Sequence, residues 1–311
     1  MKTLRIATRK SQLALWQATY VRTQLQRIAP DLEVQLVGVT TEGDRDQASP
    51  LTAIGGRGVF IKALEKVLLE EKADIAVHSM KDVPSVVAGG LKLTAVLERE
   101  DPRDALLSDQ ATFDELPAGA RIATSSLRRR FQLAHRRPDL IFEELRGNVD
   151  TRLRRLRSGD FDAIVLAVAG LKRLGLDDAI VDYLSVETSV PAAGQGAIGV
   201  ECRDQGTGDP ISTLVEELDH PVTSRCTAIE RQVTASLFAT CDLPVGVHAE
   251  PINDGRAGER AKISAFVADV GGTHQLRSNV IGPFEKVAET LLQQLQEQNV
   301  QNLMTSGDVT L

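Results

Sequence analysis

The sequence is poor in the residue types on which several classes of protein depend. Its three cysteines are too few, and odd in number, for a disulfide framework, and none lies in a CxxC spacing that would favour a structural zinc site. Aromatic residues make up 4% of the 311 residues, and the formal net charge is -7. A general nucleic-acid binder is therefore disfavoured, because such a protein needs a basic surface and side chains that stack on bases.

Long apolar runs are also missing. No stretch approaches the length needed to cross a bilayer, and the first residues, MKTLRIATRKSQLALW, lack the apolar core of a signal peptide. Hydrophobic residues make up 42% and charged residues 25%, which excludes collagen-like, disordered and coiled-coil classes. We therefore expect a globular protein of the cytoplasm, with two or three domains at this length.

Positive charge is concentrated in one segment. Residues 121–173 hold twelve arginines and one lysine against six acidic residues, which gives a local balance of +7. The rest of the chain then carries -14. This segment is suited to attract anions within a protein that otherwise repels them.

Strand and helix patterns alternate along the first two thirds of the chain, which predicts two α/β units with parallel strand pairing. The expected strands are 4–8, 34–39, 74–78, 91–97, 121–124, 141–145 and 163–167. The expected helices are 12–28, 59–71, 127–137 and 149–157. The charged segment 99–104 is interpreted as a crossing between domains. A glycine-rich return segment, 191–197, leads into an expected strand at 198–200.

The last third has the pattern of a small α+β domain. Helices are expected at 224–237 and 284–297, and strands at 263–267 and 276–281. Cys241 falls in a loop bounded by Pro244 and Gly246, which makes it the best candidate for a reactive thiol. The alternative is a small buried hydrophobic residue, and a Cys-His pair with His78 or His248 has no support in the spacing.

Polar residues follow the expected strands, where open α/β sheets bind their ligands. Arg9 and Ser11 follow the first strand, and segments 78–84 and 124–130 follow two others. Guanidinium groups and helix N-termini at these positions suit carboxylates or phosphates. Within 78–84, Asp82 could stabilise a developing cation or move a proton, although a surface pair with Lys81 is an equal alternative.

The arginines allow two interpretations. A run of charge is usually a solvated face, and about half of these side chains are expected to be no more than that. Arginines at several separate strand ends, such as Arg146 and Arg173, instead favour a substrate with several carboxylates. On the helix 149–157, Arg152 and Arg155 share a face, while Arg154 belongs to a neighbouring, solvated row.

These segments resemble the porphobilinogen deaminase family, also called hydroxymethylbilane synthases. The matching segments are RIATRKSQLALWQA (5–18), GGRGVFIKALE (55–65), ADIAVHSMKDVP (73–84), EREDPRDA (98–105), TSSLRRR (124–130), RRPDL (136–140), LRGNVDTRL (145–153), LAVAGLKRLG (166–175) and GQGAIGVECR (194–203). They follow one another in order along nearly the whole chain. The resemblance is most specific up to about residue 203.

The resemblance implies an α/β fold with two lobes like those of type II periplasmic binding proteins and a small α+β C-terminal domain. The implied domains are 1–98 with 196–214, then 99–195, then 215–311. The implied reaction joins four porphobilinogen units head to tail, with loss of ammonia, to give hydroxymethylbilane for tetrapyrrole synthesis. The implied cofactor is a dipyrromethane held by a thioether to Cys241, and no metal is implied.

The resemblance also assigns roles to residues. Asp82 matches the catalytic aspartate, which stabilises positive charge on pyrrole nitrogens. Basic and polar side chains match positions that hold the carboxylates of substrate and cofactor. These are Arg9, Ser11, Gln17, Ser79, Lys81, Thr124, Ser126, Arg128, Arg129, Arg146, Arg152 and Arg173. The family commonly has two glycines where Ala239 and Thr240 stand, and a basic residue at Ala53.

The expected partner is the small molecule porphobilinogen, with no nucleic acid and no membrane, and we expect a monomer. A second hypothesis is a non-enzymatic anion-binding protein on the same two-lobed fold. It accounts for the arginines but gives no role to Cys241 or to the third domain.

Overall fold

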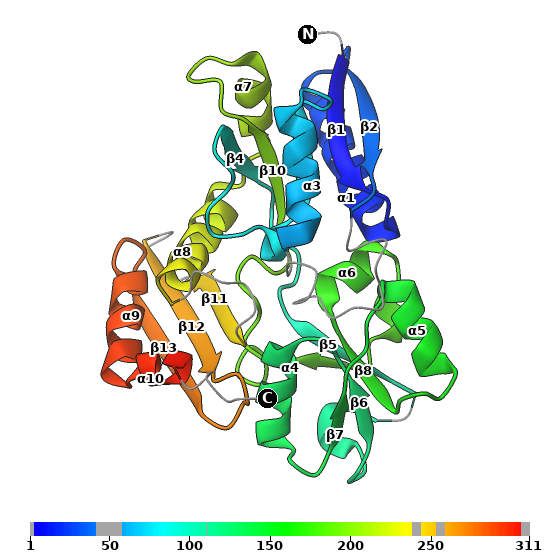
Figure 1. Cartoon of the computed structure of the whole chain (residues 1–311), viewed down its shortest axis with the longest axis vertical. Helices are drawn as coiled ribbons and strands as arrows, with labels where there is room; N and C mark the ends of the chain where they lie inside the picture. Colours follow the sequence, from blue (N-terminus) through cyan, green and yellow to red (C-terminus); the bar gives the residue numbers. More distant parts are fainter. Residues whose placement is uncertain (1–2, 42–57, 110, 238–243, 253–258, 306–311) are drawn as a thin grey trace. The chain divides into compact units, whose positions relative to one another are not determined.

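The computed structural model describes residues 3–41, 58–109, 111–237, 244–252 and 259–305 (Figure 1). The chain divides into two compact units. Unit 1 comprises Met1–Glu100 and Gly196–Ser224, and unit 2 comprises Asp101–Gln195 and Arg225–Leu311. Unit 1 is therefore built from two separate stretches of chain.

Unit 1 contains a five-stranded sheet in the order β2-β1-β3-β10-β4. Its strands are β1 (Thr3–Arg9), β2 (Glu33–Val39), β3 (Ile75–Ser79), β4 (Leu91–Val96) and β10 (Ile198–Arg203). Its helices are α1 (Gln12–Ile28), α3 (Gly58–Leu69), α7 (Pro210–Glu216) and the short 3-10 helix η2 (Met80–Asp82). Strands β2, β1 and β3 are parallel, whereas β10 is antiparallel to both of its neighbours.

Each face of this sheet is covered by helices, because successive side chains of a strand point to opposite faces. On β1, Ile6 packs in one apolar cluster with α1 and α7, and the next residue, Ala7, packs in another with α3. Both side chains are fully buried. A sheet covered on both faces is expected for parallel strands joined by helices.

Unit 2 begins with a second five-stranded sheet, in the order β7-β6-β8-β5-β9. Its strands are β5 (Asp104–Ser108), β6 (Arg121–Ala123), β7 (Ile141–Glu143), β8 (Ala163–Ala167) and β9 (Asp182–Leu184). Its helical elements are η3 (Phe113–Glu115), α4 (Leu127–Arg136), α5 (Val149–Arg157), α6 (Val168–Arg173) and η4 (Asp177–Ala179). Helices α5 and α6 pack on one face of the sheet, and α4 with η3 on the other.

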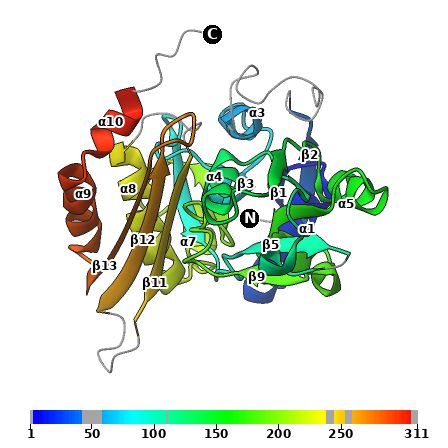
Figure 2. The same ribbon diagram turned by 90° about the horizontal axis from the view of Figure 1, so that it is seen from below.

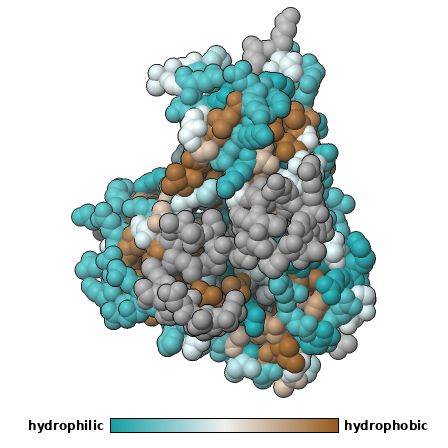
Figure 3. Space-filling model, viewed as in Figure 1, coloured by the Kyte–Doolittle hydropathy of each residue, from teal (hydrophilic) through white to brown (hydrophobic). Residues whose placement is uncertain are grey.

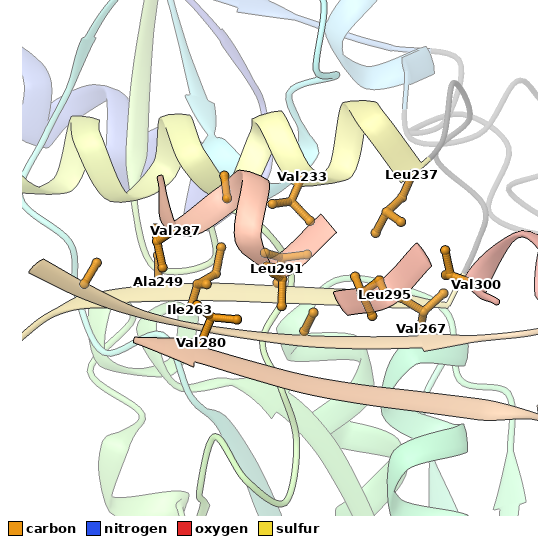
Figure 4. Close-up of a cluster of buried hydrophobic side chains, with 14 of the residues drawn as sticks. Val233, Leu237, Ala249, Ile263, Val267, Val280, Val287, Leu291, Leu295 and Val300 are labelled. Atoms are coloured by element: carbon orange, nitrogen blue, oxygen red, sulfur yellow. The ribbon is translucent and has the colours of Figure 1, made fainter. Parts of the chain in front are cut away.

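The C-terminal part of unit 2 is a three-stranded antiparallel sheet in the order β11-β12-β13, with helices on one face (Figure 2). The elements are α8 (Pro221–Leu237), β11 (Val245–Pro251), β12 (Arg260–Ala268), β13 (Gln275–Pro283), α9 (Val287–Glu297) and α10 (Val300–Thr305). Figure 4 shows Val233 of α8, Leu291 of α9 and Val300 of α10 pointing toward the strands. The opposite side of α9 is hydrophilic, as the left edge of Figure 3 shows.

The fold class expected from the sequence is confirmed, with two α/β lobes and a small α+β part. The expected strand pairing was too simple, because β10 and β5 run antiparallel to their neighbours. Asp104 begins a buried strand and is not part of a crossing segment, and β9 and β11 were not expected. The expected division into three domains stays a prediction. None of the helices in the described ranges is long and apolar enough to span a bilayer.

Candidate functional site

In unit 1, the first candidate residues lie where β1 ends and α1 begins. Ser11 is the N-cap of α1, and its hydroxyl accepts a hydrogen bond from the Ala14 amide at 3.3 Å. The Arg9 guanidinium lies over the Phe60 ring, 3.9 Å from its centroid. A half-buried cation is thus fixed beside a helix N-terminus, and both groups favour an anion.

The end of β3 is joined to α1 by a pair of polar side chains. Gln17 is buried on α1, and its Nε2 donates to Ser79 Oγ at 2.9 Å. Ser79 Oγ in turn lies 3.2 Å from Gln17 Oε1. The structure therefore brings Gln17 and Ser79 together, and their contact fixes the point at which the chain leaves the sheet.

Asp82 ends the short helix η2, immediately after β3. The Met80 amide donates to the Ala197 carbonyl at 3.0 Å, which ties this helix to the start of β10. Lys81 and Asp82 are both half-buried. Within the described ranges, the Asp82 carboxylate has no hydrogen-bond or ion-pair partner. It is therefore available to a ligand on this unit.

The two histidines considered as partners of a thiol are both engaged with glutamates. His78 Nε2 lies 3.0 Å from Glu201 Oε2, and both side chains are buried. His248 Nδ1 lies 3.5 Å from Glu230 Oε1 in another buried pair. These contacts give no support to a Cys-His pair. Cys241 itself lies outside the described residues, as do Ala53, Ala239 and Thr240.

In unit 2, Asp104 organises the first arginines. Its fully buried carboxylate contacts Arg128 Nη1 at 2.8 Å, Arg129 Nε at 2.9 Å, Ser189 Oγ at 2.7 Å and Gln195 Nε2 at 2.9 Å. Burial alone would favour the neutral acid, but the two guanidinium groups hold the pKa of Asp104 far below its usual range. The carboxylate is therefore charged and fixes both arginines.

The first turn of α4 is arranged by two hydroxyls. Thr124 Oγ1 accepts from the Ser126 amide at 3.2 Å, and Ser126, the N-cap, accepts from the Arg129 amide at 3.4 Å. Arg128 Nη1 also donates to the Val190 carbonyl at 2.6 Å. The sequence predicted these positions as ligand-binding. The structure shows that Ser126 caps the helix, that Thr124 holds the amide of this N-cap residue, and that Arg128 is held largely by the protein itself.

A second group of arginines has no carboxylate among its described contacts. Arg152 Nε donates to the Gly147 carbonyl at 2.9 Å, and Arg152 Nη2 donates to Ser125 Oγ at 3.3 Å. Burial, followed by repulsion from Arg129 and Arg146, lowers the pKa of Arg152 to about 10. Arg146 Nη1 is buried and finds no hydrogen-bond partner among the described residues. Neighbouring cations with an unsatisfied donor are chemically suited to an anion.

The other arginines of the basic segment differ from this group. Arg173 is buried at the end of α6, as its assignment to the site requires. Arg155 pairs with Asp160 at 2.8 Å at the surface, and Arg154 is exposed. Arg154 is solvated as expected, but Arg155 is exposed too, although it was expected to share a face with Arg152. No group of three or more potential metal ligands occurs in the part of the chain that the structure describes.

The sequence reasoning missed the residues that hold the arginines in place. Asp104, Ser189 and Gln195 form hydrogen bonds with one another or with Arg128. Asp104 was inside a segment that resembled the family, EREDPRDA, but its charge suggested a linker. A signal was present in the apolar residues 105–107 that follow it, which are typical of a buried strand.

Comparison with known proteins gives consistent matches. A family model described as porphobilinogen deaminase, dipyromethane cofactor binding domain, matches residues 4–208. The porphobilinogen deaminase of Pelobacter propionicus is 46% identical over 284 residues, which are 91% of this chain and 89% of that protein. The porphobilinogen deaminase of Geobacter sulfurreducens is 43% identical over 297 residues, which are 94% of this chain and 91% of that protein.

Two solved structures are similar at low sequence identity. The periplasmic aliphatic sulphonate binding protein SsuA from Escherichia coli is 13% identical, with a TM-score of 0.40 over 76% of this chain and 70% of that one. The VFT2 domain of Bordetella pertussis BvgS is 16% identical, with a TM-score of 0.42 over 74% of this chain and 92% of that one.

Proposed function

The chain belongs to the porphobilinogen deaminase family, and we propose that it joins four porphobilinogen units head to tail to give hydroxymethylbilane. In each addition the C–N bond of porphobilinogen and a C–H bond of the terminal pyrrole break, a C–C bond forms between the two units, and the nitrogen leaves as ammonia with the released proton. Water finally cleaves the four-unit chain from its anchor and supplies the hydroxyl group of the product. The main structural support for this proposal is the group Arg129, Arg146 and Arg152. Within this group the buried donor Arg146 Nη1 has no hydrogen-bond partner among the described residues.

We assign the arginines of unit 2 to the carboxylates of the pyrroles. Each pyrrole carries two carboxylates, so a growing chain is a polyanion that needs several guanidinium groups. Arg146 Nη1 has no hydrogen-bond partner among the described residues, and Arg152 bonds to a carbonyl and a hydroxyl instead of a carboxylate. Arg173 is added because it matches the family. Arg128 and Arg129 contribute charge while Asp104 fixes their orientation.

We assign the charge-stabilising role to Asp82. Loss of ammonia leaves positive charge on the pyrrole, and a carboxylate close to its nitrogen lowers the energy of that state. The absence of a partner for this carboxylate within the described ranges supports the assignment. Arg9, Ser11, Gln17, Ser79 and Lys81, all on unit 1, are assigned to substrate binding beside it.

The same arginines fit a dipyrromethane cofactor, which also carries carboxylates. Arg129, Arg146 and Arg152 would hold it, and we assign its thioether link to Cys241. When bound, the cofactor supplies the anchored end to which substrate units are added. A free thiol requires a reducing compartment, and the two described cysteines, Cys202 and Cys226, are free. We therefore propose a cytoplasmic location. We also propose a monomer that binds neither nucleic acid nor membranes, in line with the net charge of -7.

Incubation with porphobilinogen tests the proposed reaction. We expect consumption of porphobilinogen with release of one ammonia per unit. Asp82→Asn should lower turnover by at least about a hundredfold while the fold persists, because charge stabilisation is lost. The exposed Asp31→Asn is the matched control in the same unit and should be unaffected. Reversible binding without ammonia release would instead identify an anion-binding protein.

Intact-mass measurement tests the cofactor. The protein as isolated should be heavier than its sequence by two condensed pyrrole units, and Cys241→Ala should abolish this increment. Cys226→Ala is the control, because Cys226 is buried on α8. An active preparation with the bare sequence mass would contradict the covalent attachment.

A further inference from the structure

The C-terminal sheet of unit 2 has a second packed face. On β12, Ile263, Ala265 and Val267 point to the helices α8 to α10. The alternate residues Phe266 and Ala268 point the other way, because side chains along a strand alternate between faces. There they form a small buried cluster with Phe131 of α4 and Val190. The sheet therefore contacts the helix that carries Arg128 and Arg129.

The turn between β12 and β13 is held rigid by one carboxylate. Asp269 Oδ1 accepts from the Thr273 amide at 2.8 Å, and Asp269 Oδ2 accepts from the His274 amide at 3.2 Å. The Gly272 amide donates to the Asp269 carbonyl at 3.0 Å. Side-chain bonds of this kind fix the path of a short turn. The turn therefore presents a defined surface to its neighbours.

That surface is Gly272, which lies directly on the Phe131 ring. A Cβ placed on Gly272 would come within 2.6 Å of Phe131 Cγ and Cε1, and φ at Gly272 is +73°. Gln275 adds a polar contact, because its Nε2 donates to the Phe131 carbonyl at 3.1 Å. A side chain and a backbone carbonyl of α4 are thus both held by the hairpin.

Strand β11 makes a second close approach to the same region. A Cβ on Gly246 would lie 2.5 Å from the Val190 carbonyl oxygen. This oxygen accepts from Arg128 Nη1 at 2.6 Å and from Gln132 Nε2 at 3.2 Å. A displacement of Val190 would therefore move an acceptor of the Arg128 guanidinium directly.

We propose that the C-terminal sheet is a positioning element for α4, with Gly272, Gly246 and Phe131 as positioning residues for the Arg128 guanidinium. The sheet touches the ring of Phe131 through one glycine and the Val190 carbonyl through another. The positioning of α4 is inferred from packing alone. Only its consequence, weaker binding of substrate carboxylates when α4 is displaced, rests on the proposed function.

Hydrogen exchange in the full-length protein tests the packing. Gly272→Ala and Gly246→Ala should each speed exchange of the α4 amides, such as Arg130 and Arg137, by at least about tenfold. Gly271→Ala is the matched control, because its Cβ would make only ordinary contacts, with Thr273 Oγ1 at 3.5 Å and Asp269 Oδ1 at 3.9 Å. Gly119→Ala controls for positive φ, because Gly119 has φ +80° and open space around it.

A double variant separates positioning from general damage to the sheet. Phe131→Leu makes room for the new methyl group, so Phe131→Leu/Gly272→Ala should exchange more slowly in α4 than Gly272→Ala alone. It should also recover the kinetics. We expect the KM for porphobilinogen to rise about tenfold in Gly272→Ala with kcat changed less than about threefold, since binding is affected before chemistry.

Any one of three hydrogen-exchange outcomes would overturn the inference. These are unchanged α4 exchange in both glycine variants, equal effects in the two controls, and no rescue by Phe131→Leu. Faster α4 exchange with an unchanged KM would also overturn the positioning role. If the unsubstituted protein does not consume porphobilinogen, the proposed function fails, and hydrogen exchange and its rescue still decide whether the sheet positions α4.

Discussion

Asp104 is a single buried carboxylate to which two cations and two neutral donors bind. Arg128 and Arg129 satisfy its charge, while Ser189 and Gln195 satisfy its remaining lone pairs. Buried ions are tolerated only when they are paired and hydrogen-bonded in this way. The same bonds fix the two guanidinium groups, so that Asp104 links the stability of unit 2 to the geometry of the proposed anion site.

Asp104→Asn should destabilise the protein by about 3 kcal/mol or more, because two buried guanidinium groups would lose their counter-charge. Urea denaturation measures this change. Asp114→Asn is the matched control, because its pair with Arg136 is exposed and worth at most about 1 kcal/mol. Equal losses in the two variants would contradict the role given to the buried carboxylate.

Substitution of Arg146, unlike that of Asp104, is expected to change activity and not stability. Its Nη1 is buried without a partner among the described residues, so Arg146→Met removes an unsatisfied donor and should change stability by less than about 1 kcal/mol. The same change should lower kcat/KM for porphobilinogen by about a hundredfold, because a carboxylate would lose a charged hydrogen bond. The exposed Arg154→Met should leave both quantities unaltered. An activity loss shared by the two variants would count against a specific site.

At the scale of elements, the position of η2 at the end of β3 depends on contacts with β10. Ser79 pairs with Ile198, and the Met80 amide bonds to the Ala197 carbonyl. Gly199 leaves room for Met80, since a Cβ there would lie 2.9 Å from Leu93 Cδ1 and closer still to the Met80 sulfur. The short helix that carries Asp82 is therefore seated on a strand from a distant part of the chain.

Gly199→Ala should destabilise unit 1 by about 1–3 kcal/mol, because the core around Met80 is already full. It should also lower kcat, because Met80 cannot move without its neighbours in η2. Steady-state kinetics and urea denaturation measure the two effects. Gly38→Ala in β2 of the same sheet is the control, since its Cβ would meet only the flexible side chain of Lys10. A stable, fully active Gly199→Ala protein would show that η2 can be displaced from β10 without loss of function.

The elements differ in how well the sequence predicts them. Helices α1 and α5 have the expected bounds, since each has a polar N-cap, Ser11 or Asn148, followed by apolar residues at helical spacing. Strand β5 was not predicted because it begins with a charged residue. Its antiparallel direction depends on pairing with β8 and β9, where Asp104 lies opposite Ala167 and Leu184, and no local pattern reveals these distant partners.

At the scale of the whole molecule, buried carboxylates set the response to acid. Burial opposes ionisation of Asp74, but hydrogen bonds from Arg5 and from Arg203 hold its pKa below the usual range. Burial likewise opposes ionisation of Asp101, but hydrogen bonds from Arg103 lower its pKa. Glu65 differs, because burial raises its pKa. Carboxylates with a lowered pKa outnumber the one with a raised pKa, so acid should destabilise the fold.

The free energy of unfolding should be constant near neutral pH and fall below about pH 4. A depressed folded pKa means that the unfolded chain binds protons first, so the stability is present above the unfolded pKa and is lost as the pH drops through the folded one. Urea denaturation between pH 7 and pH 3 measures the decline. Asp74→Asn should reduce its slope, whereas the exposed Asp31→Asn should not. A stability that stays constant down to pH 3 would contradict these ion pairs.

The candidate site was predictable to the extent that it follows strand ends. Asp82 and Arg146 became candidates because carboxylates and arginines after strands mark a ligand edge. The role of Asp82 and the inclusion of Arg152, which lies on a helix, came from the resemblance to the family. The sequence did not predict which arginines are buried and which are exposed. Arg128 and Arg129 are adjacent in one motif with Arg130, yet the first two are buried on Asp104 and the third is exposed. Burial at such positions depends on packing from segments that the motif does not contain.

The interrupted course of unit 1 has a consequence for its synthesis. Strand β10 lies between β3 and β4, yet the ribosome makes it only after all of segment 101–195. At about 5–20 residues per second, β3 and β4 wait roughly 5–20 s for the strand that joins them. During that interval both present open edges to other nascent chains. The order of translation therefore places the greatest exposure to misassembly on the half of the protein that carries Asp82.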